Sequence, residues 1–295
     1  MNLGARVTLG LLWLVHLLPV GWQAALGAGL GRLLHALARS RRRVAERNVE
    51  LCLPALDAVA RARLVREHFR WLGRSLLERG LLWYAPRARL ERLIEVEGDV
   101  HFAERHAGPV MWLVPHFMAL EVAATAAQLF QQRRACTIYQ RQTNPVFDAA
   151  VRAGRERFGE SLLLSRQDRA KRLVRAIQKD GLAFFNLPDM DFGPKDSEFV
   201  PFFGVPACTL LAPSRMARLL GMAVQPVLAE MREGGGWTVR FLPPWTDWPT
   251  DDVLEDTRRM NAWIESEVRR NPAQYLWVHK RFKTRPPGEP SLYRG

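Results

Sequence analysis

The sequence predicts an α/β protein in which a mixed, largely parallel central sheet is flanked by helices and preceded by an N-terminal membrane-anchoring helix. Short apolar or alternating runs, typical of strands, alternate along the chain with longer amphipathic runs, typical of helices. The 295 residues are 48% hydrophobic and 25% charged, as in a folded protein with a sizeable core. Residues 7–31 carry no charged side chain. We therefore expect an anchor in residues 1–31 and a single α/β domain in residues 32–295.

The uncharged N-terminal run is long enough to cross a membrane, which takes about 20 apolar residues. His16 and Pro19 interrupt it, so three alternatives stay open: one spanning helix, a kinked or amphipathic interfacial helix, or a cleaved signal peptide. The signal peptide ranks last because the run is long and a strongly basic segment, residues 32–47, follows it. That segment predicts a domain on the cytoplasmic side of the inner membrane, close to anionic lipids.

The elements of the domain follow from periodicity and end signals. Residues 55–84 show apolar side chains at helical spacing, residues 94–98 alternate, and residues 109–116 form an apolar run typical of a buried strand. Asn144 caps a helix that begins at Pro145. Further expected strands are 135–142, 182–189, 222–231 and 237–244. Further expected helices are 118–132, 145–159, 169–181, 210–221 and 253–272. Residues 191–207 are rich in glycine and proline and are expected to form a loop.

The charge balance is strongly basic, with 43 Lys+Arg against 30 Asp+Glu and a formal net charge of +13. Such a surface suits nucleic acid, anionic lipid headgroups or an acidic protein. A nucleic-acid-binding protein is disfavoured because no recognised module is visible and the N-terminal run is apolar. Cys52, Cys136 and Cys208 are scattered, so neither a metal site nor a disulfide framework is predicted. We expect thiols in a reducing compartment.

One histidine stands where an α/β sheet places its ligands. In "VPHFMALE", His116 ends a predicted strand and Glu121 lies in the first turn of the next helix. If His116 precedes the helix, the glutamate is able to reach back to one ring nitrogen and leave the other free as a base. The GxSxG elbow of a serine nucleophile is absent. This pattern favours direct activation of a substrate hydroxyl, while a histidine satisfied within the core is the simpler alternative.

Four segments resemble the bacterial lipid A biosynthesis late acyltransferases, the lauroyl/myristoyl transferases of the lysophospholipid acyltransferase superfamily. They are "VPHFMALE", "NPVFDAAVRAGRERFG", "PDMDFGPKDSEFVPFFGVPA" and "QYLWVHKRFKTRPPGEPSLY". The resemblance runs from the N-terminal segment to nearly the last residue. It implies transfer of a fatty acyl chain from acyl carrier protein to a hydroxyl of a Kdo-bearing lipid A precursor at the cytoplasmic face of the inner membrane. Beyond this donor substrate it implies no cofactor or metal.

The resemblance also implies roles for individual residues. The superfamily's His-x4-Asp/Glu motif matches His116 as general base and Glu121 as its orienting acid. Substrate-binding roles are implied for a basic set and an acidic motif with its adjacent lysine: Arg141, Arg155, Arg157, Asp189, Asp191 and Lys195. Gln140 stands where many relatives carry an arginine. The acidic motif is also typical of a turn, and "HKRFKTRP" is either a headgroup-facing segment or a solvated tail.

Two alternatives to a lipid A enzyme remain at this stage. An acyltransferase for another membrane glycolipid or aminolipid shares every catalytic feature and differs in its acceptor. A non-catalytic membrane adaptor needs neither His116 nor Glu121. We expect the acyl carrier protein, the lipid A precursor and anionic inner-membrane lipids as partners, and no nucleic acid.

Overall fold

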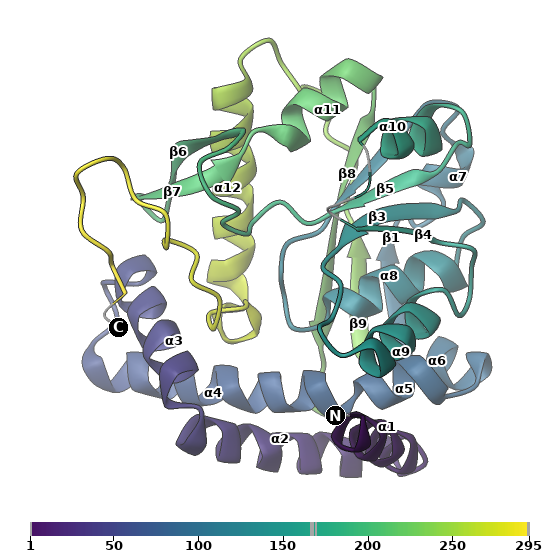
Figure 1. Cartoon of the computed structure of the whole chain (residues 1–295), viewed down its shortest axis with the longest axis vertical. Helices are drawn as coiled ribbons and strands as arrows, with labels where there is room; N and C mark the ends of the chain where they lie inside the picture. Colours follow the sequence, from purple (N-terminus) through teal and green to yellow (C-terminus); the bar gives the residue numbers. More distant parts are fainter. Residues whose placement is uncertain (1, 166–167, 169, 294–295) are drawn as a thin grey trace.

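The computed structural model (Figure 1) describes residues 2–165, 168 and 170–293. Within these residues a seven-stranded sheet has the order β1-β9-β8-β2-β5-β3-β4. Its strands are β1 (Ile94–Gly98), β2 (Val110–Leu113), β3 (Ala135–Tyr139), β4 (Leu162–Ser165), β5 (Ala183–Asn186), β8 (Ala223–Met231) and β9 (Trp237–Phe241). The five strands from β8 to β4 are mutually parallel, and β9 pairs antiparallel with β8 and parallel with β1. The predicted mixed, largely parallel sheet is confirmed.

Helices cover both faces of this sheet, as predicted. They are α4 (Ala58–Leu77), α5 (Arg79–Tyr84), α6 (Arg87–Leu93), α7 (Phe102–Arg105), α8 (Leu120–Leu129), α9 (Pro145–Arg155), α10 (Ala170–Gln178), α11 (Ala212–Leu220), α12 (Val253–Arg270) and the 3₁₀ turn η1 (Pro272–Gln274). The helix expected over 169–181 begins at a residue outside the described ones. Strand β4, a run of four residues between two expected helices, was not expected.

The central strand β2 explains how two cores form around one sheet. All four of its residues are buried, as expected for a strand covered on both faces. Val110 and Trp112 pack with α5, α8 and α9 in one core. Met111 and Leu113 pack with α10, α11 and α12 in the other core. The two cores hold the carboxyl end of β2, where His116 follows, at the centre of the molecule.

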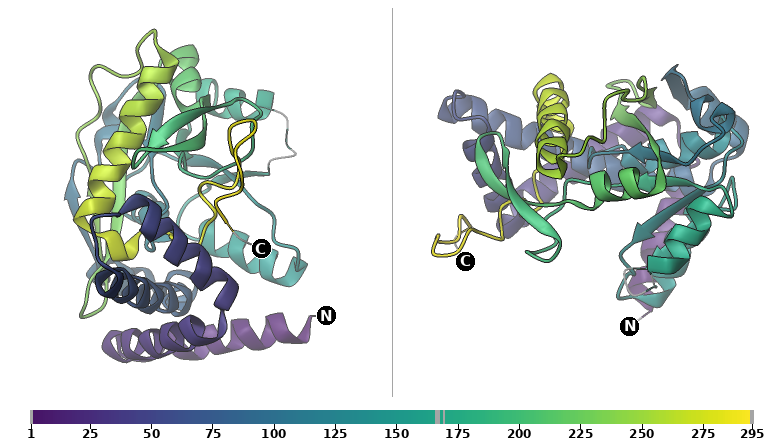
Figure 2. Two further views of the ribbon diagram at one scale, coloured as in Figure 1. Left: turned by 90° about the vertical axis from the view of Figure 1, so that its left-hand side faces the viewer. Right: turned by 90° about the horizontal axis from the view of Figure 1, so that it is seen from above.

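The N-terminal run differs from the expected single anchoring helix. It forms α1 (Leu3–Val15) and α2 (Val20–Leu37), and the chain turns between them at Pro19, which has no N–H to continue a helix. Helix α3 (Arg39–Cys52) follows. None of the helices in the described part of the chain is both long and apolar enough to cross a membrane. Figure 2 shows α1, α2 and α3, in purple, at one end of the molecule, opposite α11.

Glycines bring α2 against α4. A Cβ added at Gly73 of α4 would lie 2.3 Å from the carbonyl oxygen of Gly27 and 2.3 Å from the nitrogen of Gly31, both on α2. Backbone atoms this close leave no room for a side chain. Glycine at these positions therefore allows α2 to lie directly on α4, and the N-terminal segment is packed onto the domain.

The prediction of a loop over residues 191–207 was wrong, because most of this segment forms a β-hairpin. Strands β6 (Ser197–Phe202) and β7 (Val205–Leu210) pair antiparallel apart from the main sheet. Phe203 and Gly204 form the turn with φ of 53° and 76°, which matches the right-handed twist of a hairpin. Pro201 faces Pro206 across the pair. Prolines are tolerated here because the ribbon has two free edges, so the proline content was a misleading signal.

Candidate active site

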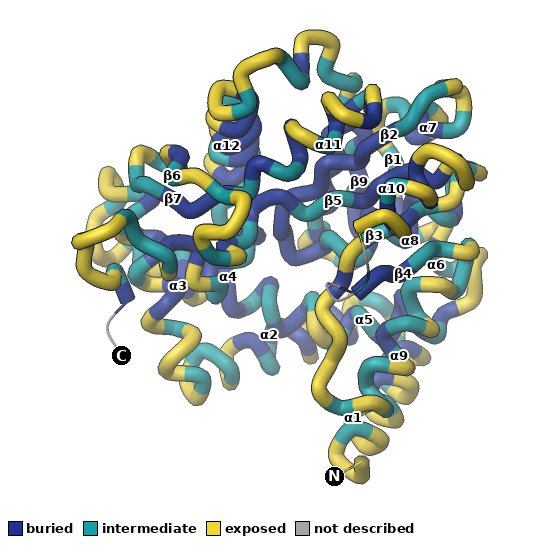
Figure 3. The backbone as a smooth tube through the Cα atoms, turned by 45° about the horizontal axis from the view of Figure 1, so that its top comes forward, coloured by how far each residue is buried: buried dark blue, intermediate teal, exposed yellow. Residues whose placement is uncertain are grey.

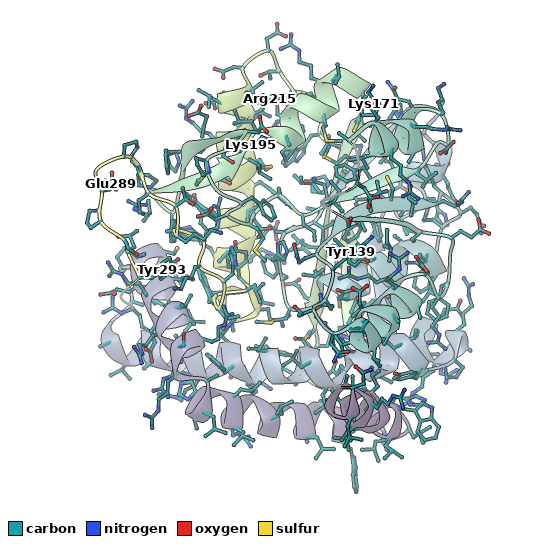
Figure 4. All side chains as sticks on the ribbon, viewed as in Figure 1. Tyr139, Lys171, Lys195, Arg215, Glu289 and Tyr293 are labelled. Atoms are coloured by element: carbon teal, nitrogen blue, oxygen red, sulfur yellow. The ribbon has the colours of Figure 1, made fainter. Side chains whose placement is uncertain are left out.

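The loop between β2 and α8 carries His116, at the edge of the sheet where the parallel strands end. Its backbone is tied to the segment that follows α12. The His116 carbonyl accepts from Leu276 N at 3.0 Å, and Met118 N donates to the Gln274 carbonyl at 2.8 Å. Farther along, the Tyr293 hydroxyl donates to Asn48 Oδ1 of α3 at 2.6 Å, and Figure 4 shows Tyr293 beside that helix. The C-terminal segment therefore fixes the position of His116.

Asp189 is the carboxylate that holds the imidazole. It follows β5, the neighbour of β2, and its Oδ1 lies 2.6 Å from His116 Nδ1. His116 N donates to Asp189 Oδ2 at 2.9 Å. A carboxylate at Nδ1 assigns the ring proton to that nitrogen and leaves Nε2 as the acceptor. Nε2 forms no hydrogen bond with any described residue, and the His116 side chain is 11% exposed. The resemblance implied substrate binding for Asp189, and the structure buries its carboxylate against His116.

Glu121 does not make the hydrogen bond with His116 that the sequence predicted. It lies in the first turn of α8 and accepts from Arg155 of α9, through Nε at 3.0 Å and also through Nη2. Burial alone would raise the pKa of the Glu121 carboxyl, but the Arg155 guanidinium outweighs it and lowers the pKa to about 2. His116 contributes in the same direction. Glu121 is thus a permanent carboxylate near the imidazole, paired with arginine.

The remaining predicted basic residues do not gather at His116. Arg157 donates to the carbonyls of Leu82 and Tyr84 at the end of α5, at 3.3 and 3.2 Å, so it joins α9 to α5. Arg141 lies exposed in the loop between β3 and α9, and Lys195 lies exposed before β6. Neither makes an ion pair with a described residue. Figure 4 shows Lys195 near the hairpin, on a different element from Tyr139 of β3.

The Asp191 carboxylate accepts three hydrogen bonds within the described chain. Its Oδ1 accepts from Gly193 N and Thr284 Oγ1, each at 2.9 Å, and its Oδ2 accepts from Thr284 N at 2.8 Å. The hydrogen bond with Gly193 agrees with the alternative that the acidic motif forms a turn. The hydrogen bonds with Thr284 hold the C-terminal segment in place. That segment is neither a solvated tail nor wholly surface, since Arg281 and Phe282 are buried between exposed lysines.

A small cavity of about 10 Å³ lies against His116, enough for about one water molecule. Its polar lining residues are Asn48, His116, Asp189, Tyr275, His279 and Arg281. Burial, followed by the proximity of His116, lowers the pKa of His279 to about 4, so this second imidazole is neutral. Burial and the nearby Asp189 raise the pKa of Tyr275 well above its usual range. Among the polar residues that line this cavity with His116, Asp189 and Arg281 are therefore charged, and His279 and Tyr275 are neutral.

Comparison with known proteins identifies the family. The family described as bacterial lipid A biosynthesis acyltransferase matches residues 3–284. The chain belongs to this family. It is 35% identical to the lipid A biosynthesis lauroyltransferase of Escherichia coli K12, over 97% of this chain and 93% of the relative. The palmitoleoyltransferase of the same organism is 34% identical, with coverages of 97% and 92%. The myristoyltransferase is 31% identical, with coverages of 95% and 87%.

The lipid A biosynthesis acyltransferase fold thus presents an imidazole suited to acyl transfer. One ring nitrogen is held by a buried carboxylate and the other has no hydrogen-bond partner among the described residues, which are two features that a general base requires. The predicted enzyme class is confirmed by the family. Of the predicted site residues, the structure joins His116 to Asp189 and Glu121 to Arg155. The hydrogen bonds between His116 and the C-terminal segment were missed, because their partners are backbone groups that carry no sequence signal.

Proposed function

We propose that this acyltransferase moves a fatty acyl chain from the thioester of acyl carrier protein to a hydroxyl of a Kdo-bearing lipid A precursor, with His116 as general base. The observation that supports the base role is the 2.6 Å contact between His116 Nδ1 and the buried Asp189. It fixes the ring by Nδ1, while Nε2 makes no hydrogen bond with a described residue and the side chain is 11% exposed. The names of the relatives support the lipid A acceptor.

The reaction follows from this geometry in two steps. The acceptor oxygen attacks the thioester carbonyl while His116 Nε2 takes the hydroxyl proton, and Asp189 stabilises the imidazolium that forms. The carbon–sulfur bond then breaks, and the leaving thiolate takes the proton from the His116 imidazolium, which returns to the neutral base. General base catalysis of this kind contributes roughly 10²–10⁴-fold. The protein forms no covalent bond with the acyl chain in this scheme.

The arginines are proposed to bind the anionic acceptor. Arg155 is held by Glu121 with its side chain 24% exposed, and Arg152 of the same helix donates to the Tyr139 hydroxyl at 2.9 Å. A guanidinium fixed in this way offers its free N–H groups to a phosphate or carboxylate. Glu121 is proposed to keep Arg155 in place and to add negative charge near His116. Arg141 and Lys195 are proposed as exposed, more distant contacts.

A direct assay tests the proposed reaction. Purified protein, acyl carrier protein thioester and a Kdo-bearing lipid A precursor are expected to yield a lipid heavier by one acyl group, detected by mass spectrometry. Three other acceptors serve as comparison: a lipid A precursor that lacks Kdo, an ornithine lipid and a phosphoinositol mannoside. Transfer to one of the last two lipids, together with none to either lipid A precursor, would contradict the proposed acceptor.

We also propose that α1 and α2 lie in the interface of the inner membrane, with the domain on the cytoplasmic side. Figure 3 shows much of α1 as exposed. The large apolar side chains exposed on this part of the chain are Leu3, Val7, Leu11, Trp13, Leu14, Leu17, Trp22, Leu26, Leu33 and Leu37. Arg39, Arg41 and Arg43 of α3 are exposed next to them in the chain. An apolar face beside arginines is typical of interfacial binding to anionic lipids.

The double variant Trp22→Glu/Leu26→Glu is expected to weaken binding to vesicles that contain an anionic phospholipid. Both side chains are exposed, at 66% and 49%, and a fully buried apolar side chain is worth about 1.5–3 kcal/mol, so the loss should exceed about tenfold. Vesicle sedimentation measures it. Leu219→Glu is the control, since Leu219 is 77% exposed on α11 at the opposite end of the molecule. Equal sedimentation of all three proteins would rule out this binding surface.

A further inference from the structure

We propose that Arg281 is a positioning residue for the base: its buried positive charge keeps Asp189 as a carboxylate beside His116. This inference rests on the proposed role of His116. Arg281 lies in the C-terminal segment, within the run that the sequence presents as surface charge. It lines the same small cavity as His116 and Asp189.

The contacts of Arg281 show a cation without a direct ionic partner. The residue is 3% exposed. Its Nη1 donates to the Cys208 carbonyl at 2.9 Å and its Nη2 to Thr209 Oγ1 at 2.7 Å. Its Nε is buried and has no hydrogen-bond partner, and within the described chain no carboxylate lies at ion-pair distance. Burying such a charge is unfavourable unless other charges compensate it. The Phe202 ring, with its centroid 5.4 Å from Arg281 Cζ, supplies a cation–π contact, and we infer that the remaining compensation acts through space.

Two buried carboxylates are available to compensate it: Asp189, which lines the same cavity, and Asp191, which lies two residues further along the chain. Burial alone would raise the pKa of Asp189, but His116 and then Arg281 lower it. With Arg281 present, the three side chains carry one net negative charge, and the cluster becomes neutral when His116 accepts a proton. Without Arg281, two carboxylates would share a buried site with no cation, which favours protonation of one of them. A protonated Asp189 would no longer stabilise the imidazolium.

Other ionisable groups around His116 do not replace this charge. On the α8 side the negative Glu121 is already paired with Arg155, and Arg79 of α5 acts on Glu121. His279 and Tyr275 are neutral, as described above. The thiols of Cys52 and Cys208 stay protonated, since burial raises the pKa of each. Lys283 is exposed. Arg281 is therefore the buried cation on the side of Asp189.

The pH dependence of kcat/KM for acyl transfer tests this role. Arg281→Met removes a positive charge, so the His116–Asp189 pair binds a proton more tightly. The fall of kcat/KM on the acidic side of its pH profile, the acid limb, should therefore move to higher pH by about one unit. Arg281→Lys retains the charge and should return the limb toward its original position. Thr209→Val removes one hydrogen bond to the guanidinium and no charge, so its acid limb should stay in place even if its activity falls.

The opposite change gives an independent check. Asp191→Asn removes one negative charge from the cluster, so its acid limb should move to lower pH, and the double variant Arg281→Met/Asp191→Asn should lie near the original profile. Activity lost equally at every pH in Arg281→Met, with the limb unmoved, would make Arg281 purely structural. If Arg281→Met does not fold, an unmoved limb in Asp191→Asn overturns the proposal. Either result leaves the base role intact, because that role fails only if His116 variants keep full activity.

Discussion

His116→Ala is expected to lower kcat for acyl transfer by about 10³-fold, within the range that a general base contributes. The loss arises because no other described group occupies the position of Nε2, and His279 faces the cavity from a separate segment. The protein should stay folded, since the backbone bonds of the loop with Leu276 and Gln274 do not use the imidazole. Circular dichroism and vesicle binding check the fold, and a purified transfer assay measures kcat.

A matched control comes from a second imidazole–carboxylate pair. His101 Nδ1 lies 2.6 Å from Glu104 Oε1 on the surface, with the histidine side chain 52% exposed, and His101→Ala should keep full activity. Turnover by His116→Ala equal to that of His101→Ala would eliminate the base role. It would favour the alternative of a membrane adaptor without catalytic function.

Asp189→Asn is expected to have the second largest effect, a loss in kcat on the order of 10³-fold. The amide is close in size but carries no charge, so it neither fixes the Nδ1–H tautomer nor stabilises the imidazolium. Because Asp189 is 1% exposed, solvent does not replace the missing charge. Single-turnover kinetics with saturating acceptor isolates this effect from binding.

Glu121→Gln provides the comparison that separates the two carboxylates. It removes the ion pair with Arg155 and leaves the His116–Asp189 contact in place, so we expect a loss of roughly tenfold to a hundredfold, mainly through KM for the lipid acceptor. A larger fall in kcat for Glu121→Gln than for Asp189→Asn would show that Glu121 is the carboxylate that acts on the base.

Much of the fold could be predicted because periodicity is local. The apolar run of β2 and the Asn144–Pro145 start of α9 appear in the structure as expected, with Asn144 Oδ1 accepting from Val146 N at 3.0 Å. The errors lie where local signals mislead. The β6–β7 hairpin carries prolines on free edges, and the length of the uncharged N-terminal run favoured one anchoring helix although Pro19 interrupts it.

The site was only partly predictable, since its pairings depend on strand order. His116 and Glu121 are close in sequence, which favoured a local pair. Asp189 reaches His116 because β5 lies next to β2 in the sheet, and one sequence does not reveal that adjacency. Arg281 was hidden within a charged run that looks solvated, because burial of one arginine among exposed lysines has no compositional signature.

The ties between the His116 loop and the segment after α12 have a consequence for folding. Met118 N and the His116 carbonyl find their partners in Gln274 and Leu276, so closing this loop requires contacts between residues far apart in the chain. Contacts between distant segments slow folding. The sheet has the same requirement, since β1 pairs with β9 and β2 with β8, so catalytic competence depends on the complete long-range assembly of the domain and no single stretch of the chain carries it.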